Sequence, residues 1–189
     1  MFRNTTDRET GMTHDITLRT LSQHEALACS EQLADVLIDC VEGGASVSFM
    51  LPLARTTALR FWHDVAAGVG RAERTLIVAE DSTGILGTVQ LITAMPDNQH
   101  HRADVAKLLV RRRARGAGVG RRLMEAVEEA ARAQGRTVLV LDTADAVAGR
   151  LYERSGWQRA GVIPDYAHLP DGALCATTFF YKHCRGGDA

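Results

Sequence analysis

Lysine is nearly absent from this chain of 189 residues, because only Lys107 and Lys182 are lysine and 20 of the 22 basic residues are arginine. Acidic residues number 23, which leaves a net charge of −1. A chain so close to neutrality is not a general binder of nucleic acid or of an anionic membrane surface. With 46% hydrophobic and 24% charged residues, the composition is typical of one ordinary globular domain of this length.

Long apolar runs and paired cysteines are also missing. No run approaches the ~20 apolar residues that span a bilayer, and the polar N-terminus lacks the apolar core of a signal peptide. The four cysteines, Cys29, Cys40, Cys175 and Cys184, form no C-x-x-C pair and no zinc-type spacing with histidine. These absences favour reduced thiols, a cytoplasmic location, and neither a membrane partner nor a bound metal.

The spacing of apolar residues predicts one domain over residues 13–184, between a flexible leader at 1–12 and a frayed tail at 185–189. The order β-α-α-β-β-β-α-β-α-β-β predicts an α/β fold of the α+β type, with a mixed, mostly antiparallel sheet flanked by helices. The expected elements are a strand at 15–19, helices at 22–43 and 54–69, strands at 75–80, 85–93 and 102–110, a helix at 118–134, a strand at 137–141, a helix at 145–154, and strands at 157–163 and 174–182.

Three side-chain placements follow from this pattern. Ser22 and Glu25 have the spacing of a capping box. Trp62 falls on the apolar face of its helix and is expected in the core. Glu128 and Arg132 are four residues apart and are expected to pair on the exposed side of the helix at 118–134.

The most informative stretch is residues 110–124, where a strand enters a glycine-punctuated turn that opens a helix among six arginines. The first N–H groups of a helix lack partners and carry positive potential, so this arrangement predicts a phosphate site. A P-loop is excluded because no Lys-Ser or Lys-Thr is present, and Arg121 stands where a dinucleotide fingerprint needs its last glycine. The alternative is an ordinary tight turn with a charged surface.

Residues 115–120, Arg-Gly-Ala-Gly-Val-Gly, fit the pattern R-x-x-G-x-G. This resembles the acyl-CoA-binding motif of the GCN5-related N-acetyltransferase (GNAT) family, and the predicted element order is also that family's order. Residues 145–157 resemble the family's N-x-x-A-x-x-L-Y-E-x-x-G-F segment, with Asp145 in place of the usual asparagine. The resemblance covers residues 14–182. It implies acetyl-CoA as cofactor, bound by Leu108, Leu109, Val110, Arg115, Gly116, Ala117, Gly118, Val119, Gly120, Arg121 and Asp145.

Residues 41–50, 102–110, 141–143 and 161–172 resemble, more narrowly, the tabtoxin resistance protein branch, which acetylates a small β-lactam toxin. This narrower resemblance implies Asp104 and Asp142 as catalytic carboxylates, and the wider family resemblance implies Tyr152 as the acid that protonates the leaving thiolate. Each has a structural alternative. Asp104 could pair with a neighbouring base, Asp142 could cap the turn after its strand, Asp145 could serve only as a helix cap, and Tyr152 could be an ordinary packed aromatic.

Acceptor contacts are expected from the irregular segment after the first long helix and from a proline-bracketed loop. These candidates are Gly44, Ser46, Phe49, Met50 and Tyr166. The resulting hypothesis is an acetyltransferase that moves the acetyl group of acetyl-CoA to an amine or hydroxyl of a small molecule. The acceptor attacks directly within a ternary complex, since no cysteine falls in the inferred site. The alternatives are a protein or peptide N-acetyltransferase and a non-catalytic acyl-CoA-binding module. A monomer and a homodimer both stay open.

Overall fold

A seven-stranded sheet in the order β1-β2-β3-β4-β5-β7-β6 runs through the computed structural model, which describes residues 15–184. Neighbouring strands are antiparallel except β4 and β5, which are parallel. The mixed, mostly antiparallel sheet is therefore confirmed, while the expected leader and tail lie outside the described residues. The strands are β1 Thr17–Leu21, β2 Arg74–Asp81, β3 Gly84–Ile92, β4 Arg102–Val110, β5 Val138–Thr143, β6 Gln158–His168 and β7 Leu174–His183.

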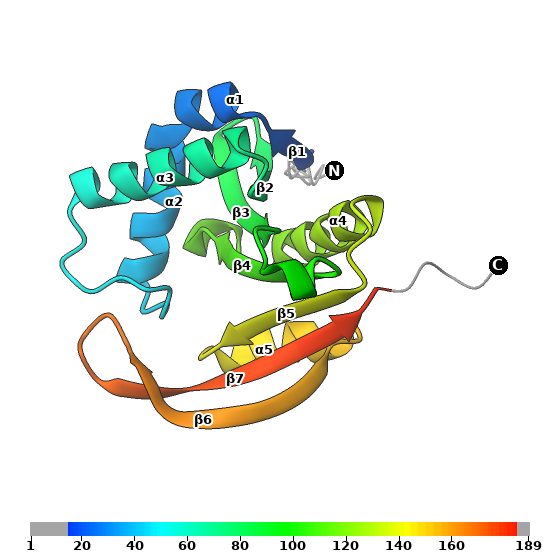
Figure 1. Ribbon diagram of the computed structural model, residues 1–189. Helices are drawn as coiled ribbons and strands as arrows, with labels where there is room; N and C mark the ends of the chain where they lie inside the picture. Colours follow the sequence, from blue (N-terminus) through cyan, green and yellow to red (C-terminus); the bar gives the residue numbers. More distant parts are fainter. Residues whose placement is uncertain (1–14, 185–189) are drawn as a thin grey trace, which may run out of the picture.

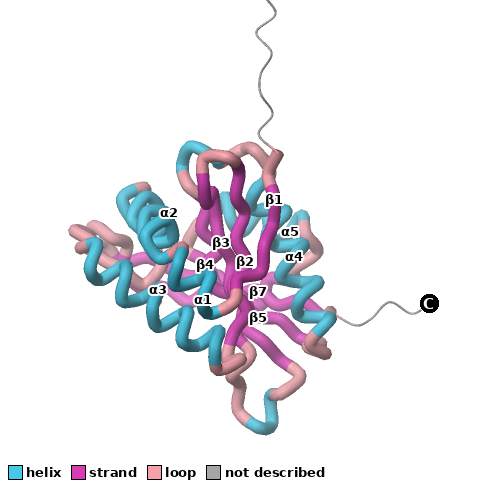
Figure 2. Tube along the Cα trace, turned by 90° about the horizontal axis from the view of Figure 1, so that it is seen from above, coloured by secondary structure: helices cyan, strands magenta, loops and turns pink. Residues whose placement is uncertain are grey.

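Helices cover both faces of the sheet (Figures 1 and 2). Two hydrophobic clusters hold them there: one packs α1, α2 and α3 on one face, and the other packs α4 and α5 on the opposite face. None of the helices within residues 15–184 is long and apolar enough to span a membrane. The helices are α1 Gln23–Ala28, α2 Ser30–Glu42, α3 Arg55–Gly70, α4 Val119–Ala133 and α5 Ala146–Arg154, with short 3-10 turns at Asp97–Gln99 and Arg112–Ala114.

Most element boundaries fall within two residues of the predicted ones, with three departures, of which the extension of β5 is only two residues long. The first helix breaks at Cys29, so that α1 and α2 are separate helices, although the Ser22–Glu25 capping box is confirmed. No proline or glycine stands at the break. β5 continues through Asp142, and β6 continues to His168.

Buried side chains give one confirmation and one correction. Trp62 is completely buried in the cluster of α1, α2 and α3. The expected exposed pair of Glu128 with Arg132 is wrong. Glu128 is buried instead, accepting a hydrogen bond from Trp157 Nε1 at 2.8 Å and an ion-pair contact from Lys182 Nζ at 2.6 Å. These long-range partners, on β7 and at the start of β6, override the local helical spacing.

The sheet opens between β4 and β5. Their pairing covers only Arg102–Asp104 and Val138–Val140, and beyond it the β5, β7 and β6 strands turn away from β4 (Figure 1). A β-bulge in β4 lies at the opening, where Lys107 has a left-handed φ of 52° and its carbonyl accepts a hydrogen bond from the buried Thr88 hydroxyl at 3.1 Å. The backbone of β4 after Asp104 thus has no strand partner on the β5 side within residues 15–184.

Candidate functional site

The turn between β4 and α4 presents a row of free backbone donors. Among the described residues, the N–H groups from Gly116 to Arg121 reach no protein acceptor, and the first bond of the helix runs from Arg122 N to Gly118 O at 3.1 Å. Gly116 and Gly118 have left-handed φ values of 84° and 78°, and nothing lies within 4 Å of a Cβ built at either position. Free N–H groups at the start of a 15-residue helix, with open space before them, suit an anion such as a phosphate.

Gly120 has a different role in the same turn. A Cβ there would lie 3.3 Å from Leu151 Cδ2 of α5 and 3.9 Å from Val110 Cγ2. The third glycine of the motif therefore lets α5 approach the beginning of α4 closely. This contact brings the segment at 145–157 beside the donor row.

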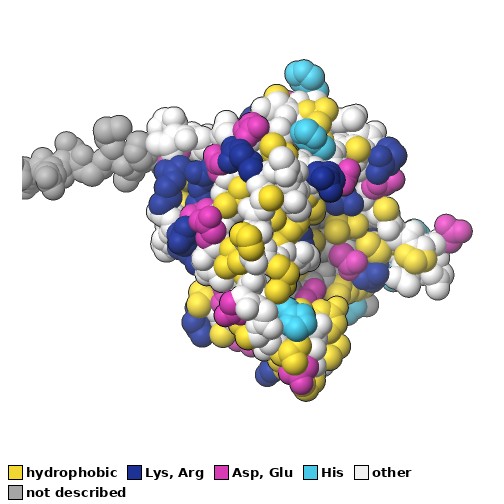
Figure 3. Space-filling view, turned by 90° about the vertical axis from the view of Figure 1, so that its left-hand side faces the viewer, with side chains coloured by type: hydrophobic (Ala, Val, Ile, Leu, Met, Phe, Trp, Pro, Cys, Tyr) yellow, Lys and Arg dark blue, Asp and Glu magenta, His cyan; other side chains and the backbone are white. Residues whose placement is uncertain are grey.

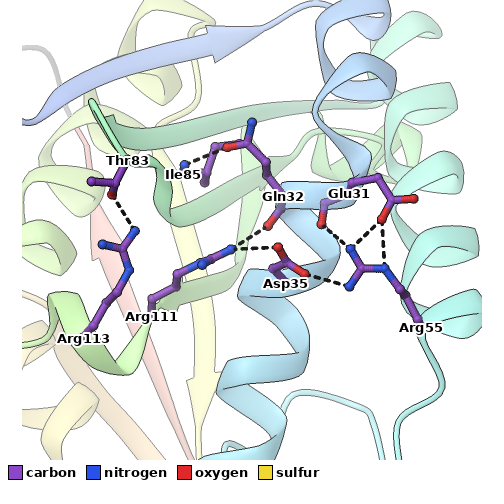
Figure 4. A network of polar contacts seen from close by, with 8 residues as sticks. All are labelled: Glu31, Gln32, Asp35, Arg55, Thr83, Ile85, Arg111 and Arg113. Atoms are coloured by element: carbon purple, nitrogen blue, oxygen red, sulfur yellow. Dashed lines mark hydrogen bonds and ion pairs between the residues drawn. The ribbon is translucent and has the colours of Figure 1, made fainter.

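The arginines around this turn divide into two groups. Arg111, Arg112 and Arg113 are held by protein partners, so they hold the turn against α2 and the β2–β3 turn, as Figure 4 shows in part. Arg115 donates to the Val110 carbonyl at 3.4 Å and also contacts the Cys40 thiol, but it forms no ion pair with a carboxylate of the described residues and is exposed beside the free donors. The contacts of the first group are Arg111 with Asp35 at 3.3 Å, Arg112 with Asp39 at 2.9 Å and Arg113 with Thr83 at 2.7 Å. Arg121, in the first turn of α4, pairs with Glu125 of the same helix at 2.8 Å.

Asp39 fixes the turn from α2. Its carboxylate accepts from the backbone N of Arg112 at 2.7 Å and from Nε of the same residue at 2.9 Å. Burial acts to raise the pKa of Asp39, but these two donors and the arginine charges outweigh burial, and the pKa lies below its ordinary value of 3.8. Asp39 is therefore an anionic anchor for the turn.

A cavity of about 190 Å³ lies in the opening between β4 and β5. Its walls are residues 45–48 after α2, residues 105–108 of β4, residues 141–145, and Ala148 and Tyr152 of α5. Figure 3 faces the side of the molecule where the segment after α2 and the β6–β7 hairpin approach each other, and the surface is hollowed there among hydrophobic side chains. The cavity is thus reached by residues from both faces of the sheet.

The two predicted carboxylates occupy different surroundings. Asp142 lines the cavity and accepts a hydrogen bond from the Thr177 hydroxyl at 2.9 Å, so it does not cap the turn after its strand. Asp104 is on β4, in register with Val140 of β5, and pairs with Arg102. Asp104 does not line the cavity. Its contact with Arg102 matches the structural alternative that the sequence left open, in which Asp104 pairs with a neighbouring basic residue.

Asp145 is the N-cap residue of α5, and Tyr152 lies in the last turn of the same helix. The Tyr152 ring packs against Trp157 and Phe180, at centroid distances of 6.1 and 5.7 Å, and the side chain lines the cavity. Burial, with smaller contributions from Asp145 and Asp142, raises the pKa of Tyr152 well above its usual value, so the phenol stays protonated. Asp145 lines the cavity too, and it caps α5 by accepting from Val147 N at 2.7 Å.

Only some of the other predicted residues line the cavity. Leu108 does, whereas Leu109 is buried in the core and Val110 lies further along β4 toward the glycine turn. Ser46 lines the cavity and donates to the His168 carbonyl of the β6–β7 hairpin at 3.1 Å. The other four acceptor candidates lie outside the cavity. Phe49 packs on Phe61, Tyr166 packs on Phe179, Met50 is exposed, and Gly44 has a left-handed φ of 85°.

Lys107 is the charged residue of the cavity that the sequence did not point to. Its ammonium donates to Ser48 Oγ at 3.1 Å and lies 5.9 Å from the centre of the Phe61 ring. Strand alternation assigns alternate residues to opposite faces, and the bulge breaks that alternation at this residue. A lone lysine within an apolar strand was the available signal. Within residues 15–184, no group of three or more His, Cys, Asp or Glu side chains could hold a metal ion.

Comparisons with known proteins agree with this geometry. Residues 72–159 match the model of the Acetyltransferase (GNAT) domain family. A protein described as "Uncharacterized N-acetyltransferase in hisH-hisA intergenic region" of Azospirillum brasilense is 36% identical over 128 residues, covering 67% of this chain and 70% of that protein.

Solved structures share the whole fold at lower identity. YncA of Salmonella typhimurium, whose structure holds its cofactor acetyl-CoA, has a TM-score of 0.74 at 17% identity, covering 93% of this chain and 97% of that one. The ribosomal-protein-alanine N-acetyltransferase of Brucella melitensis has a TM-score of 0.70 at 22% identity, covering 88% and 99%. With the relative from Azospirillum and the matching family model, these findings show that the chain belongs to the GNAT family of acetyltransferases.

Proposed function

We propose that this protein transfers the acetyl group of acetyl-CoA to the amine of a small molecule. The observation that carries the proposal is the free N–H row of residues 116–121, which opens α4 beside a cavity that contains both Asp142 and Tyr152. Acetyl-CoA is a long thioester with phosphates at one end and the acetyl group at the other. Its phosphates would bind at the N–H row, and its acetyl group would lie in the cavity. A non-catalytic acyl-CoA-binding module would not need a carboxylate and a phenol beside the reacting group.

The residues of the turn fit the phosphates of acetyl-CoA. The N–H groups from Gly116 to Arg121 would bind the pyrophosphate, and Arg115 would add charge from the exposed side. Acetyl-CoA supplies the activated thioester. The unpaired backbone of β4 along residues 105–108 would run beside the pantetheine arm, and a backbone N–H there would polarise the acetyl carbonyl.

Proton transfer falls to the two polar side chains of the cavity. The amine must lose a proton as its nitrogen bonds to the thioester carbon and the carbon–sulfur bond breaks. Asp142 is placed to accept that proton, directly or through a water. Tyr152, whose phenol is protonated before the reaction, would pass its proton to the departing thiolate, and the proton that Asp142 took from the amine would restore the phenol, so that CoA leaves as the thiol. No cysteine lines the cavity among the described residues, which favours direct attack in a ternary complex.

The size of the cavity favours a small acceptor. A volume of about 190 Å³ corresponds to roughly six water molecules. It is below the ~300–1,000 Å³ of sites that hold drug-sized ligands. Transfer to a protein or peptide amine is the alternative. Acetylation of a toxin, which the narrower tabtoxin resistance resemblance implies, is one form of the proposed small-molecule transfer. We propose that the protein acts in the cytoplasm, either as a monomer or as a homodimer.

Thiol release from acetyl-CoA across a panel of amines tests the proposal. We expect thiol release that depends on the amine, together with an acetylated amine product identified by its mass. A panel of peptides with free N-termini, run alongside, separates small-molecule from peptide transfer. Binding of acetyl-CoA without turnover on any acceptor would instead support a non-catalytic module and overturn the proposed function.

A further inference from the structure

The bulge in β4 puts a positive charge inside the cavity. Lys107 is half-buried, yet its ammonium has a single hydrogen-bond acceptor within residues 15–184, the Ser48 hydroxyl at 3.1 Å. An ammonium carries three donors, so two remain for a ligand. The Phe61 ring, 5.9 Å away, and the loop at 45–48 enclose this end of the cavity without supplying an anion.

The opposite charge lies on another wall of the same cavity. Asp142 comes from β5, on the far side of the opening from Lys107 on β4, and its carboxylate is held by the Thr177 hydroxyl at 2.9 Å. Lys107 and Asp142 interact electrostatically, while the hydrogen-bond partner of the Lys107 ammonium is Ser48. A small cavity therefore holds one cationic and one anionic group, each with bonding capacity left over.

We infer that the acceptor is a zwitterionic, amino-acid-like molecule whose carboxylate binds Lys107 and Ser48 while its amine lies at Asp142. This inference rests on the proposed function and names the substrate class of the same site. Such a molecule neutralises both charged walls at once, and the distance between its two charged groups is short enough for a cavity of about 190 Å³.

The surroundings of Lys107 agree with an anionic partner. Desolvation lowers the pKa of Lys107, with Asp142 opposing that shift, so the ammonium is held at a cost that a bound carboxylate would offset. A protein lysine or a simple alkylamine brings no carboxylate and would leave Lys107 without one. The same cavity then discriminates against acceptors that lack the acid group.

The test compares amino acids with the matching α-carboxamides, which have the amine but lack the carboxylate. We expect wild type to prefer the acid by about 10- to 100-fold in kcat/KM, the range of a charge-assisted hydrogen bond. Lys107→Met should bring the preference close to one, mainly through KM for the acid. Arg132→Met removes one positive charge from the exposed end of α4 and serves as the matched control. Lys107→Gly provides a second variant, because glycine relieves the left-handed φ of 52° and so should fold.

Binding measured by calorimetry in the presence of CoA decides the inference independently of turnover. Tighter binding of the acid than of the carboxamide, lost in both Lys107 variants and kept in Arg132→Met, supports it. Equal use and equal binding of acid and carboxamide by wild type would overturn it while leaving acetyl transfer intact. A preference that survives both Lys107 variants would overturn it as well. Absence of turnover on every amine would overturn the proposed function, and the calorimetric comparison would still decide the charge of the ligand.

Discussion

Among single residues, Tyr152 combines a fixed ring with a hydroxyl that has no protein partner in the described chain. Because Trp157 and Phe180 hold the ring, Tyr152→Phe should fold normally. We expect kcat to fall by about 100-fold or more, with little change in the KM for acetyl-CoA. Steady-state kinetics measures both. Tyr181→Phe, which removes a phenol bonded to Gln158 instead, is the control. A near-normal kcat in Tyr152→Phe would remove Tyr152 from the mechanism.

The two aspartates make opposite predictions. Asp142 lines the cavity, whereas Asp104 is paired with Arg102 outside it. Asp142→Asn should lower kcat/KM for the amine by about 100-fold, and Asp104→Asn should lower it by less than about tenfold. Activity across a pH series, compared at saturating acetyl-CoA, measures this difference. A larger loss in Asp104→Asn would assign the base to Asp104 instead.

The sequence predicted some of these site residues and not others. Tyr152 and Asp142 follow recognisable local patterns, a short helix after a buried strand, and both line the cavity. Asp104 and Lys107 lie on one strand, and the resemblance implied the acid, not the lysine, as a site residue. The bulge puts Lys107 into the cavity instead, and no pattern within β4 signals its long-range contact with the Thr88 hydroxyl.

At the scale of elements, the beginning of α4 should be sensitive to side chains. Gly118→Ala puts a Cβ on a left-handed residue, which costs about 1–2 kcal/mol, and it disturbs the donor row. Gly135→Ala, after the other end of the same helix, has a similar φ of 68° and equally open space. We expect similar losses of unfolding free energy in both variants, but a raised KM for acetyl-CoA only in Gly118→Ala. Similar KM values for acetyl-CoA in the two variants would show that the turn does not bind the cofactor.

Two glutamates of α4 provide a second matched pair. Glu128 is buried against Trp157 and Lys182, while Glu125 forms an exposed pair with Arg121. Glu128→Gln leaves Lys182 without its counter-ion and should destabilise the protein by about 2–4 kcal/mol. Glu125→Gln should cost less than about 0.5 kcal/mol. Urea unfolding of the two variants measures the difference. A cost below that of Glu125→Gln would show that Lys182 finds another partner.

The periodicity of apolar residues predicted almost every helix and strand, but it did not predict for every residue whether the side chain is buried or exposed. Helix caps and glycines mark the ends of α3, α4 and α5, because these signals are local. The break at Cys29 has no proline or glycine to mark it, and the burial of Glu128 is a tertiary effect. Helical spacing alone allows Glu128 to pair with Arg132. Because β7 approaches α4, Glu128 pairs with Lys182 of β7 instead.

At the scale of the whole molecule, α2 supports the turn between β4 and α4 through Asp39. The pKa of this carboxyl is lowered in the folded protein, so its contribution is present above the ordinary value of 3.8 and is lost as pH falls through the lower folded pKa. Asp39→Asn should cost about 1–2 kcal/mol near neutral pH and raise the KM for acetyl-CoA. The stability gap to wild type should narrow below pH 3.8.

Thermal unfolding at a series of pH values measures that gap. Glu42→Gln is the control, because Glu42 is a more distant partner of the same Arg112, at 3.6 Å. A gap that stays constant with pH would show that the Asp39 charge does not anchor the turn.

The overall architecture followed from element order, because few topologies accommodate that succession of strands and helices. The position of the cavity did not. It depends on pairing between β4 and β5 that ends after Asp104, and on the segment after α2 being bound to the β6–β7 hairpin through Ser46 with His168 and through Leu51 N with the Pro170 carbonyl at 2.9 Å. Contacts between segments more than a hundred residues apart leave no local pattern in the chain.

The opening in the sheet has a kinetic consequence. Residues from both faces of the sheet line the cavity, with Ala148 and Tyr152 of α5 on one side and residues 45–48 after α2 on the other. Under the proposed function, acetyl-CoA would reach the cavity from the side of α4 and α5 and the amine from the side of the segment after α2, so both could be bound at once. We expect a sequential rate law without a half-reaction. Free CoA should inhibit competitively against acetyl-CoA but not against the amine.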